Sequence, residues 1–183
     1  MTATDPILTA ADPIVTAADP VGELVAGVVA VLARAGQTLA VAESLTGGLL
    51  CARVVDVPGA SAVLRGGVVA YATDLKVGLL GVDRAALART GPVDPQVAVA
   101  MAQGVRKRLA ATWGVSTTGV AGPDPQDGHP AGTVFVAVAG PGTSEVRKLA
   151  LPDDRAGVRA GSVRAALDLL LRAVAEHGGD AGS

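Results

Sequence analysis

Short apolar runs alternate with segments of helical periodicity along this chain, and that alternation constrains its fold more than any other feature. Apolar runs predict strands over 38–42, 67–71, 115–120, 133–139 and 144–151. Helical spacing predicts helices over 24–32, 46–55 and 74–80, one opening at Asp94 and Pro95, and one capped by Asp153 or Asp154. Gly140, Pro141 and Gly142 predict a hairpin between the last two strands. We therefore predict an α/β fold, a three-layer α/β/α sandwich on a mostly parallel mixed sheet of about five strands with one antiparallel element.

The composition limits both the core and the partners. Hydrophobic residues make up 50% of the chain, but it has only one Trp, one Tyr and one Phe. The core is therefore built from Val, Ala and Leu, which favour tightly packed layers. So few aromatic residues leave no stacking platform for single-stranded nucleic acid, and a net charge of −2 does not attract a polyanion. We expect no nucleic-acid partner.

The two ends of the chain differ from its middle. Residues 1–20 repeat a Thr-Ala-Ala-Asp-Pro pattern at a period of seven. A proline in every unit argues against a helix, so we predict a disordered tail over 1–20 rather than a partner-docking segment. The folded domain is expected over 21–177, and a second disordered stretch over 178–183.

The remaining composition argues against metals and membranes. Cys51 is the only cysteine, so neither an intrachain disulfide nor a cysteine-based zinc site can form. His129 and His177 lack partners at metal-binding spacing, and we expect no metal and no cofactor. There is no apolar run of membrane-spanning length and no signal peptide, so we expect a cytoplasmic protein without membrane contact.

The richest segment follows the first predicted strand and reads Glu-Ser-Leu-Thr-Gly-Gly from Glu43 to Gly48. In open α/β sheets, ligands bind at the carboxyl ends of the strands. Free N–H groups at a helix start, next to Gly47 and Gly48, can hold a phosphate or stabilise the oxyanion formed when Ser44 attacks a carbonyl. Equally, Ser44 and Thr46 can simply cap the helix.

Two further segments follow predicted strands. Tyr71 to Lys76 contains the only tyrosine and a lysine on a short helix. If it is buried, Lys76 loses affinity for its proton and can act as a base; on a surface helix it is only a solvated charge. Thr118 to Pro123 is a glycine-containing turn that can wrap a flat ring or a phosphate, or serve only as a turn.

Familiar catalytic signatures are absent. The chain has no P-loop and no Gly-x-Ser-x-Gly elbow, and no serine is followed by a lysine three positions later. Because both histidines lie in poor contexts, a nucleophilic Ser44 needs another base, and Lys76 is the natural candidate.

Taken together, these segments resemble the C-terminal domain of the competence-damage-inducible CinA family, also called the nicotinamide-nucleotide amidohydrolase family. That family shows Glu-Ser-x-Thr-Gly-Gly, Tyr-x-Asn-x-x-Lys, Thr-Gly-Ile-Ala-Gly-Pro and Gly-Thr-Val in this order. The chain has counterparts at 43–48, 71–76, 118–123 and 132–134. The match runs from about Val21 to about Val174.

The resemblance implies a metal-free amidase that converts nicotinamide mononucleotide into nicotinate mononucleotide and ammonia. It implies Ser44 as nucleophile, Lys76 as general base and Tyr71 as an assisting hydroxyl. The implied substrate-binding residues are Glu43, Thr46, Gly47, Gly48, Thr118, Gly119, Ala121, Gly122 and Arg155, with Arg155 meeting the phosphate. It also implies a small-molecule nucleotide substrate and a homo-oligomer.

Two departures and two alternatives accompany this interpretation. Thr73 stands where the family usually has Asn, and 90–94 lacks the family's usual histidine. The alternatives are a non-catalytic nucleotide-binding module, in which Ser44 only caps a helix, and an amidase for a related pyridine or nucleotide amide.

Overall fold

The computed structural model describes residues 19–177, and the predicted disordered segments at 1–18 and 178–183 lie outside them. Asp19 caps the first helix and Pro20 opens it, although both belong to the predicted tail. The helices are α1 (Pro20–Arg34), α2 (Leu49–Val55), α3 (Thr73–Leu80), α4 (Arg84–Thr90), α5 (Pro95–Arg108) and α6 (Arg155–His177), with a 3-10 turn, η1, at Ala60–Ala62. The strands are β1 (Leu39–Glu43), β2 (Leu64–Val69), β3 (Trp113–Gly119), β4 (Thr133–Gly140) and β5 (Thr143–Ala150).

The strands form one sheet in the order β2-β1-β3-β4-β5. β1 pairs in parallel with β2 and β3, whereas β4 is antiparallel to both β3 and β5. Four strands therefore run in one direction and only β4 runs against them. The mixed, mostly parallel sheet with one reversed element is as predicted.

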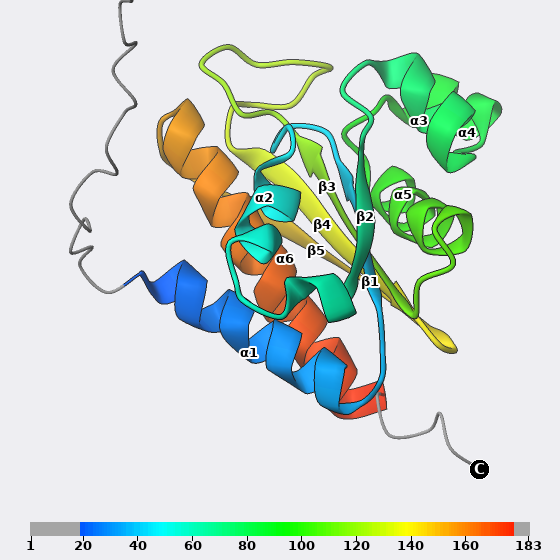
Figure 1. The fold of residues 1–183 in the computed structure, drawn as a ribbon. Helices are drawn as coiled ribbons and strands as arrows, with labels where there is room; N and C mark the ends of the chain where they lie inside the picture. Colours follow the sequence, from blue (N-terminus) through cyan, green and yellow to red (C-terminus); the bar gives the residue numbers. More distant parts are fainter. Residues whose placement is uncertain (1–18, 178–183) are drawn as a thin grey trace, which may run out of the picture.

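Helices cover both faces of the sheet (Figure 1), which gives the three predicted layers. α1, α2 and α6 lie on one face, while α3, α4 and α5 lie on the other. Alternate residues of β1 supply the two cores: Leu39 and Val41 face the first layer, and Ala40 and Ala42 face the second.

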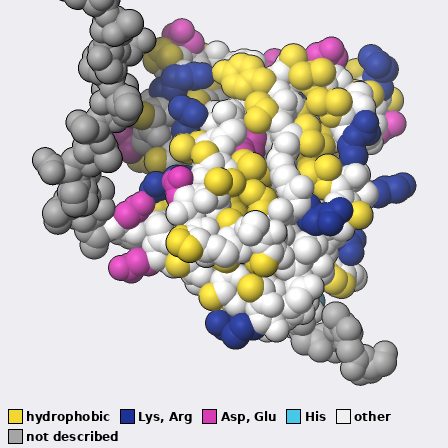
Figure 2. Space-filling model, in the orientation of Figure 1, with side chains coloured by type: hydrophobic (Ala, Val, Ile, Leu, Met, Phe, Trp, Pro, Cys, Tyr) yellow, Lys and Arg dark blue, Asp and Glu magenta, His cyan; other side chains and the backbone are white. Residues whose placement is uncertain are grey.

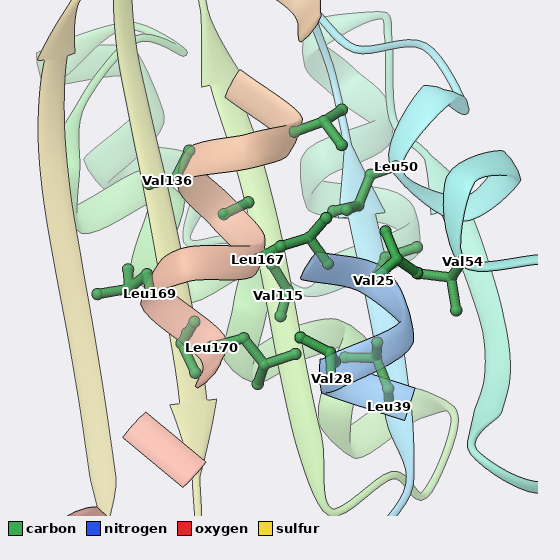
Figure 3. Close-up of a cluster of buried hydrophobic side chains, with 14 of the residues drawn as sticks. Val25, Val28, Leu39, Leu50, Val54, Val115, Val136, Leu167, Leu169 and Leu170 are labelled. Atoms are coloured by element: carbon green, nitrogen blue, oxygen red, sulfur yellow. The ribbon is translucent and has the colours of Figure 1, made fainter. Parts of the chain in front are cut away.

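The larger core lies between the sheet and the layer of α1, α2 and α6. Figure 3 shows side chains of these three helices meeting the sheet: Val25, Val28, Leu50, Val54, Leu167 and Leu170 lie around Leu39, Val115 and Val136. Trp113 is fully buried at its edge, where its Nε1 donates to Gln37 Oε1 at 2.8 Å. This core fixes β1 and α2, and so the turn between them.

The opposite layer sits unusually close to the sheet because small residues line the contact. A Cβ on Gly114 of β3 would lie 2.1 Å from the carbonyl oxygen of Ala102 in α5. Ala40, Ala42 and Ala98 are also fully buried there. The prediction that a Val-, Ala- and Gly-rich chain packs its layers tightly holds at this contact.

Some boundaries differ from the predictions. The second strand lies at Leu64–Val69 rather than 67–71, and α2 begins at Leu49, after a turn, rather than at Thr46. α4 was not predicted, although Asp83 caps it by accepting from the N–H of Ala86. Across residues 19–177, the structure has no helix with the length and apolar character needed to span a bilayer.

Candidate functional site

The site lies where β1, β2 and β3 end. Because these strands are parallel, the segments that follow them meet at one edge of the sheet. Ser44 follows β1, Lys76 follows β2 and Gly119 ends β3. β1 lies between β2 and β3, and the connections leave it in opposite directions there, so the site occupies the topological switch point of the sheet.

Ser44 and Lys76 meet directly. Nζ of Lys76 donates to Oγ of Ser44 at 3.0 Å and to the carbonyl oxygen of Ala70 at 3.0 Å. Lys76 is the fourth residue of α3, and this position directs its side chain back toward the end of β2. The alcohol and the amine are therefore within the distance needed for proton transfer.

Burial changes the chemistry of this amine. Lys76 is only 1% exposed, and desolvation lowers its pKa from 10.5 to about 8, against an opposing influence of the Asp127 carboxylate. Both ion pairs of the described chain belong to Arg53, so Lys76 has no carboxylate partner there. A minority of this amine, roughly a tenth, is therefore neutral at pH 7 and can accept a proton.

Glu43 holds the turn that carries Ser44. Its side chain is 1% exposed. Oε2 accepts from the N–H groups of Gly48 and Leu50, at 2.9 and 3.0 Å, and Oε1 accepts from that of Cys51 at 2.8 Å. The start of α2 is thus occupied by the protein's own carboxylate. Glu43 was expected to contact substrate; instead, its oxygens are turned inward and bonded to the backbone.

Thr46, Gly47 and Gly48 also make hydrogen bonds within the protein, and their expected substrate-binding role stays a prediction. Thr46 is fully buried, with its Oγ1 2.7 Å from Thr117 Oγ1. The N–H of Gly47 donates to the carbonyl of Ser44, and that of Gly48 to Glu43. The two glycines instead provide left-handed backbone, at φ of 60° and 97°, which the sharp turn requires.

The N–H groups available for an oxyanion are consequently those of Leu45 and Thr46. Neither has an acceptor among the described residues, whereas the N–H of Ser44 donates to Thr117. Leu45 also lines the cavity beside Ser44. Of the N–H groups expected to hold an oxyanion, near Thr46, Gly47 and Gly48, only that of Thr46 is unbonded among the described residues, and that of Leu45 joins it.

A cavity opens beside Ser44 and Lys76. The third predicted segment forms one wall of it through Thr118, Gly119, Ala121 and Gly122. Thr118 Oγ1 donates to the carbonyl of Pro92 at 2.7 Å, which ties this wall to the segment before α5. These four residues and Arg155 were expected at the site, and all of them line the cavity.

Tyr71 and Arg155 form a bridge at the mouth of the cavity. Arg155 Nη2 donates to Tyr71 Oη at 3.0 Å, and Nη1 donates to the carbonyl of Gly122 at 2.7 Å. Tyr71 is 59% exposed. Its hydroxyl thus bonds to the arginine rather than to Ser44 or Lys76, so any assistance to catalysis would come at the cavity mouth.

The departures from the family pattern also lie at the cavity. Thr73, which replaces the usual Asn, lines it, as do Pro92 and Val93 of the segment without the histidine. The pattern analysis missed Asp124 and Gln126, which line the cavity from the loop after β3. Their type and position after a strand were visible in the sequence, but the path of this loop was not.

Comparison with known proteins gives the family of this chain. A family model described as the CinA C-terminal domain matches residues 22–174. The chain belongs to the CinA family. A CinA-like protein of Frankia casuarinae is 53% identical over 148 residues, and one of Gloeobacter violaceus is 48% identical over 154 residues. These matches cover 81% and 82% of this chain but 34% and 36% of those proteins, so the CinA domain described here spans about a third of their length.

Solved CinA structures share the fold. A CinA superfamily protein of Klebsiella pneumoniae is 31% identical with a TM-score of 0.83, and the match covers 86% of this chain and 99% of that one. A competence/damage-inducible protein of Agrobacterium tumefaciens is 32% identical with a TM-score of 0.80, covering 83% and 94%. The α/β architecture of this CinA domain is therefore that of its family.

Proposed function

We propose that this CinA domain is an amidohydrolase that deamidates nicotinamide mononucleotide to nicotinate mononucleotide and ammonia. The observation that carries the proposal is the 3.0 Å contact between Ser44 Oγ and the nearly fully buried Nζ of Lys76. A buried lysine without a carboxylate partner is costly for stability, and such groups are enriched at catalytic sites. The choice of nicotinamide mononucleotide rests on the resemblance of the ordered motifs to the amidohydrolase family.

The reaction follows from the contacts. Neutral Lys76 takes the proton of Ser44 as Oγ attacks the carboxamide carbon, and the N–H groups of Leu45 and Thr46 bind the oxyanion. The ammonium form of Lys76 then returns the proton to the departing nitrogen, which leaves as ammonia. Water, deprotonated by Lys76, attacks the acyl-enzyme, and Lys76 returns that proton to Ser44 Oγ as the ester bond breaks, which releases the nicotinate product and restores Ser44.

The cavity walls position the substrate in this proposal. Thr118 to Gly122 offer small side chains against which a flat pyridine ring can lie. Arg155, held by Tyr71 and Gly122, retains N–H groups that can meet the phosphate of the nucleotide.

The test is ammonia release from nicotinamide mononucleotide by the purified protein and by Ser44→Ala. We expect turnover by the wild type and a loss of at least about 1,000-fold in the variant, because removal of a serine nucleophile leaves only the catalysis that binding and the oxyanion contacts supply. Far-ultraviolet circular dichroism of the variant should be unchanged, because Ser44 is only half-buried. Ammonia release by Ser44→Ala at the wild-type rate would contradict a serine nucleophile.

The same assay separates the alternatives. If the wild type binds the mononucleotide but releases no ammonia, the domain is a binding module. Faster ammonia release from another pyridine or nucleotide amide would keep the mechanism and change the substrate.

A further inference from the structure

One more cation lies beside the turn that carries Ser44. Arg159 of α6 is half-buried, and its Nη2 donates to the carbonyl oxygen of Thr46 at 2.8 Å. The position that a Cβ would take on Gly47 lies 3.9 Å from the same nitrogen. The absence of a side chain at Gly47 therefore leaves room next to this guanidinium.

Arg159 and Arg155 form a pair on one helix face. They are four residues apart in α6, so their side chains lie one turn apart on the same side. Arg155 lines the cavity, and Arg159 contacts the turn that carries Ser44 and Thr46, which we call the nucleophile turn. Figure 2 shows Lys or Arg side chains grouped at the upper left of this face, where α6 begins in Figure 1.

Neither arginine is neutralised within the described chain. Both are held by uncharged oxygens, those of Thr46, Gly122 and Tyr71, and both described ion pairs involve Arg53 instead. A guanidinium has five N–H groups, so each arginine keeps donors after these bonds are made. Two full positive charges with free, planar donors suit a phosphate monoester.

The alternative anion site on this edge is already filled. The N–H groups at the start of α2 are occupied by the carboxylate of Glu43, which would also repel a phosphate. A phosphate near the turn that carries Ser44 therefore cannot use the N–H groups at the start of α2, and the two arginines are the cations that remain beside it.

We propose that Arg159 is a second phosphate-binding residue, which grips the phosphate of the mononucleotide together with Arg155. This inference rests on the proposed function for the identity of the ligand, but it concerns binding and not the chemical step. Arg159 would thereby also couple substrate binding to the nucleophile turn, through the carbonyl of Thr46.

Titration calorimetry with two ligands tests the proposal. The ligands are nicotinate mononucleotide, which carries the phosphate and is not consumed, and nicotinate riboside, which lacks it. Arg159→Met should weaken binding of the mononucleotide by on the order of tenfold or more, as expected for a lost charge-assisted hydrogen bond, and leave binding of the riboside unchanged. Arg159→Lys should recover part of the affinity, and Arg164→Met, on an exposed part of the same helix, should match the wild type.

The outcomes distinguish binding from a structural role. Equal losses for both ligands would mean that Arg159 only holds the turn through Thr46, and would overturn the proposal, as would unchanged affinity for the mononucleotide. Kinetics give an independent readout: KM for nicotinamide mononucleotide should rise in Arg159→Met and be partly restored in Arg159→Lys.

The two proposals can fail separately. Binding of the mononucleotide that depends on Arg159, without ammonia release, would refute the amidase and support the phosphate site. Ammonia release with a KM that is the same in Arg159→Met would refute the phosphate site alone.

Discussion

Replacing Lys76 by methionine should change how the stability of the protein depends on pH. In the folded state the pKa of Lys76 is about 8, whereas in the unfolded chain it returns to 10.5. The unfolded state therefore binds the proton more tightly, and the wild type is penalised at pH values below 8. At about 1.4 kcal/mol per pKa unit, the full penalty is about 3 kcal/mol.

The penalty disappears as pH rises through the folded and then the unfolded pKa. Between pH 7 and pH 10, the wild type should gain about 2.5 kcal/mol of unfolding free energy relative to Lys76→Met. The variant also loses the bonds from Nζ to Ser44 and Ala70, which costs about 1–3 kcal/mol at every pH. The buried charge is therefore measured by how the difference in unfolding free energy between the wild type and Lys76→Met changes with pH. The absolute value of that difference does not measure it.

Urea unfolding at pH 7 and pH 10 measures this difference. Lys107→Met, at an exposed position of α5, is the matched control, and its difference from the wild type should stay constant. A constant difference for Lys76→Met as well would show that its amine is charged in the native state throughout, and the proposed base would be lost.

Two further substitutions test the surroundings of the site. Asp127→Asn removes the carboxylate that raises the pKa of Lys76, so the rising limb of kcat/KM, expected near pH 8 in the wild type, should move to lower pH; a limb that stays in place would mean that another group controls it. Glu43→Gln puts an NH₂ group against backbone N–H groups at the start of α2, so urea unfolding should show a loss of about 1–3 kcal/mol and the amidase rate should fall, whereas wild-type stability would contradict its role in the turn.

The sequence predicts that Ser44 and Lys76 lie close together only because it predicts the order of strands and helices. Each residue follows a strand, and parallel strands end at one edge, so the pattern of strands and helices already places them at the same edge. Whether Nζ of Lys76 reaches Oγ of Ser44 depends on the lysine being buried. The sequence of a short helix with one lysine does not reveal that burial. Exposed and buried lysines look alike until the position of α5 and the end of β2 are known.

Side-chain direction is what the motifs could not predict at the site. Glu43 ends a buried strand, and nothing in the motif tells whether its carboxylate faces a ligand or the backbone of α2. Contacts between segments far apart in the sequence could not be predicted from the motifs either. Glu145 of β5 offers a ligand atom within 4.8 Å of those of Glu176 and His177, at the opposite end of the sheet from Ser44, although spacing along the chain suggested no partner for that histidine.

The lowered pKa of Lys76 also makes the neutral fraction of its amine sensitive to pH near neutrality. With a pKa of about 8, roughly one molecule in ten holds the free amine at pH 7, and about half do so one pH unit higher. In the proposed amidase, only this minority would react at neutral pH, and a modest rise in pH or stronger desolvation of the nitrogen would enlarge it. The proposed activity would then increase without any change in the fold.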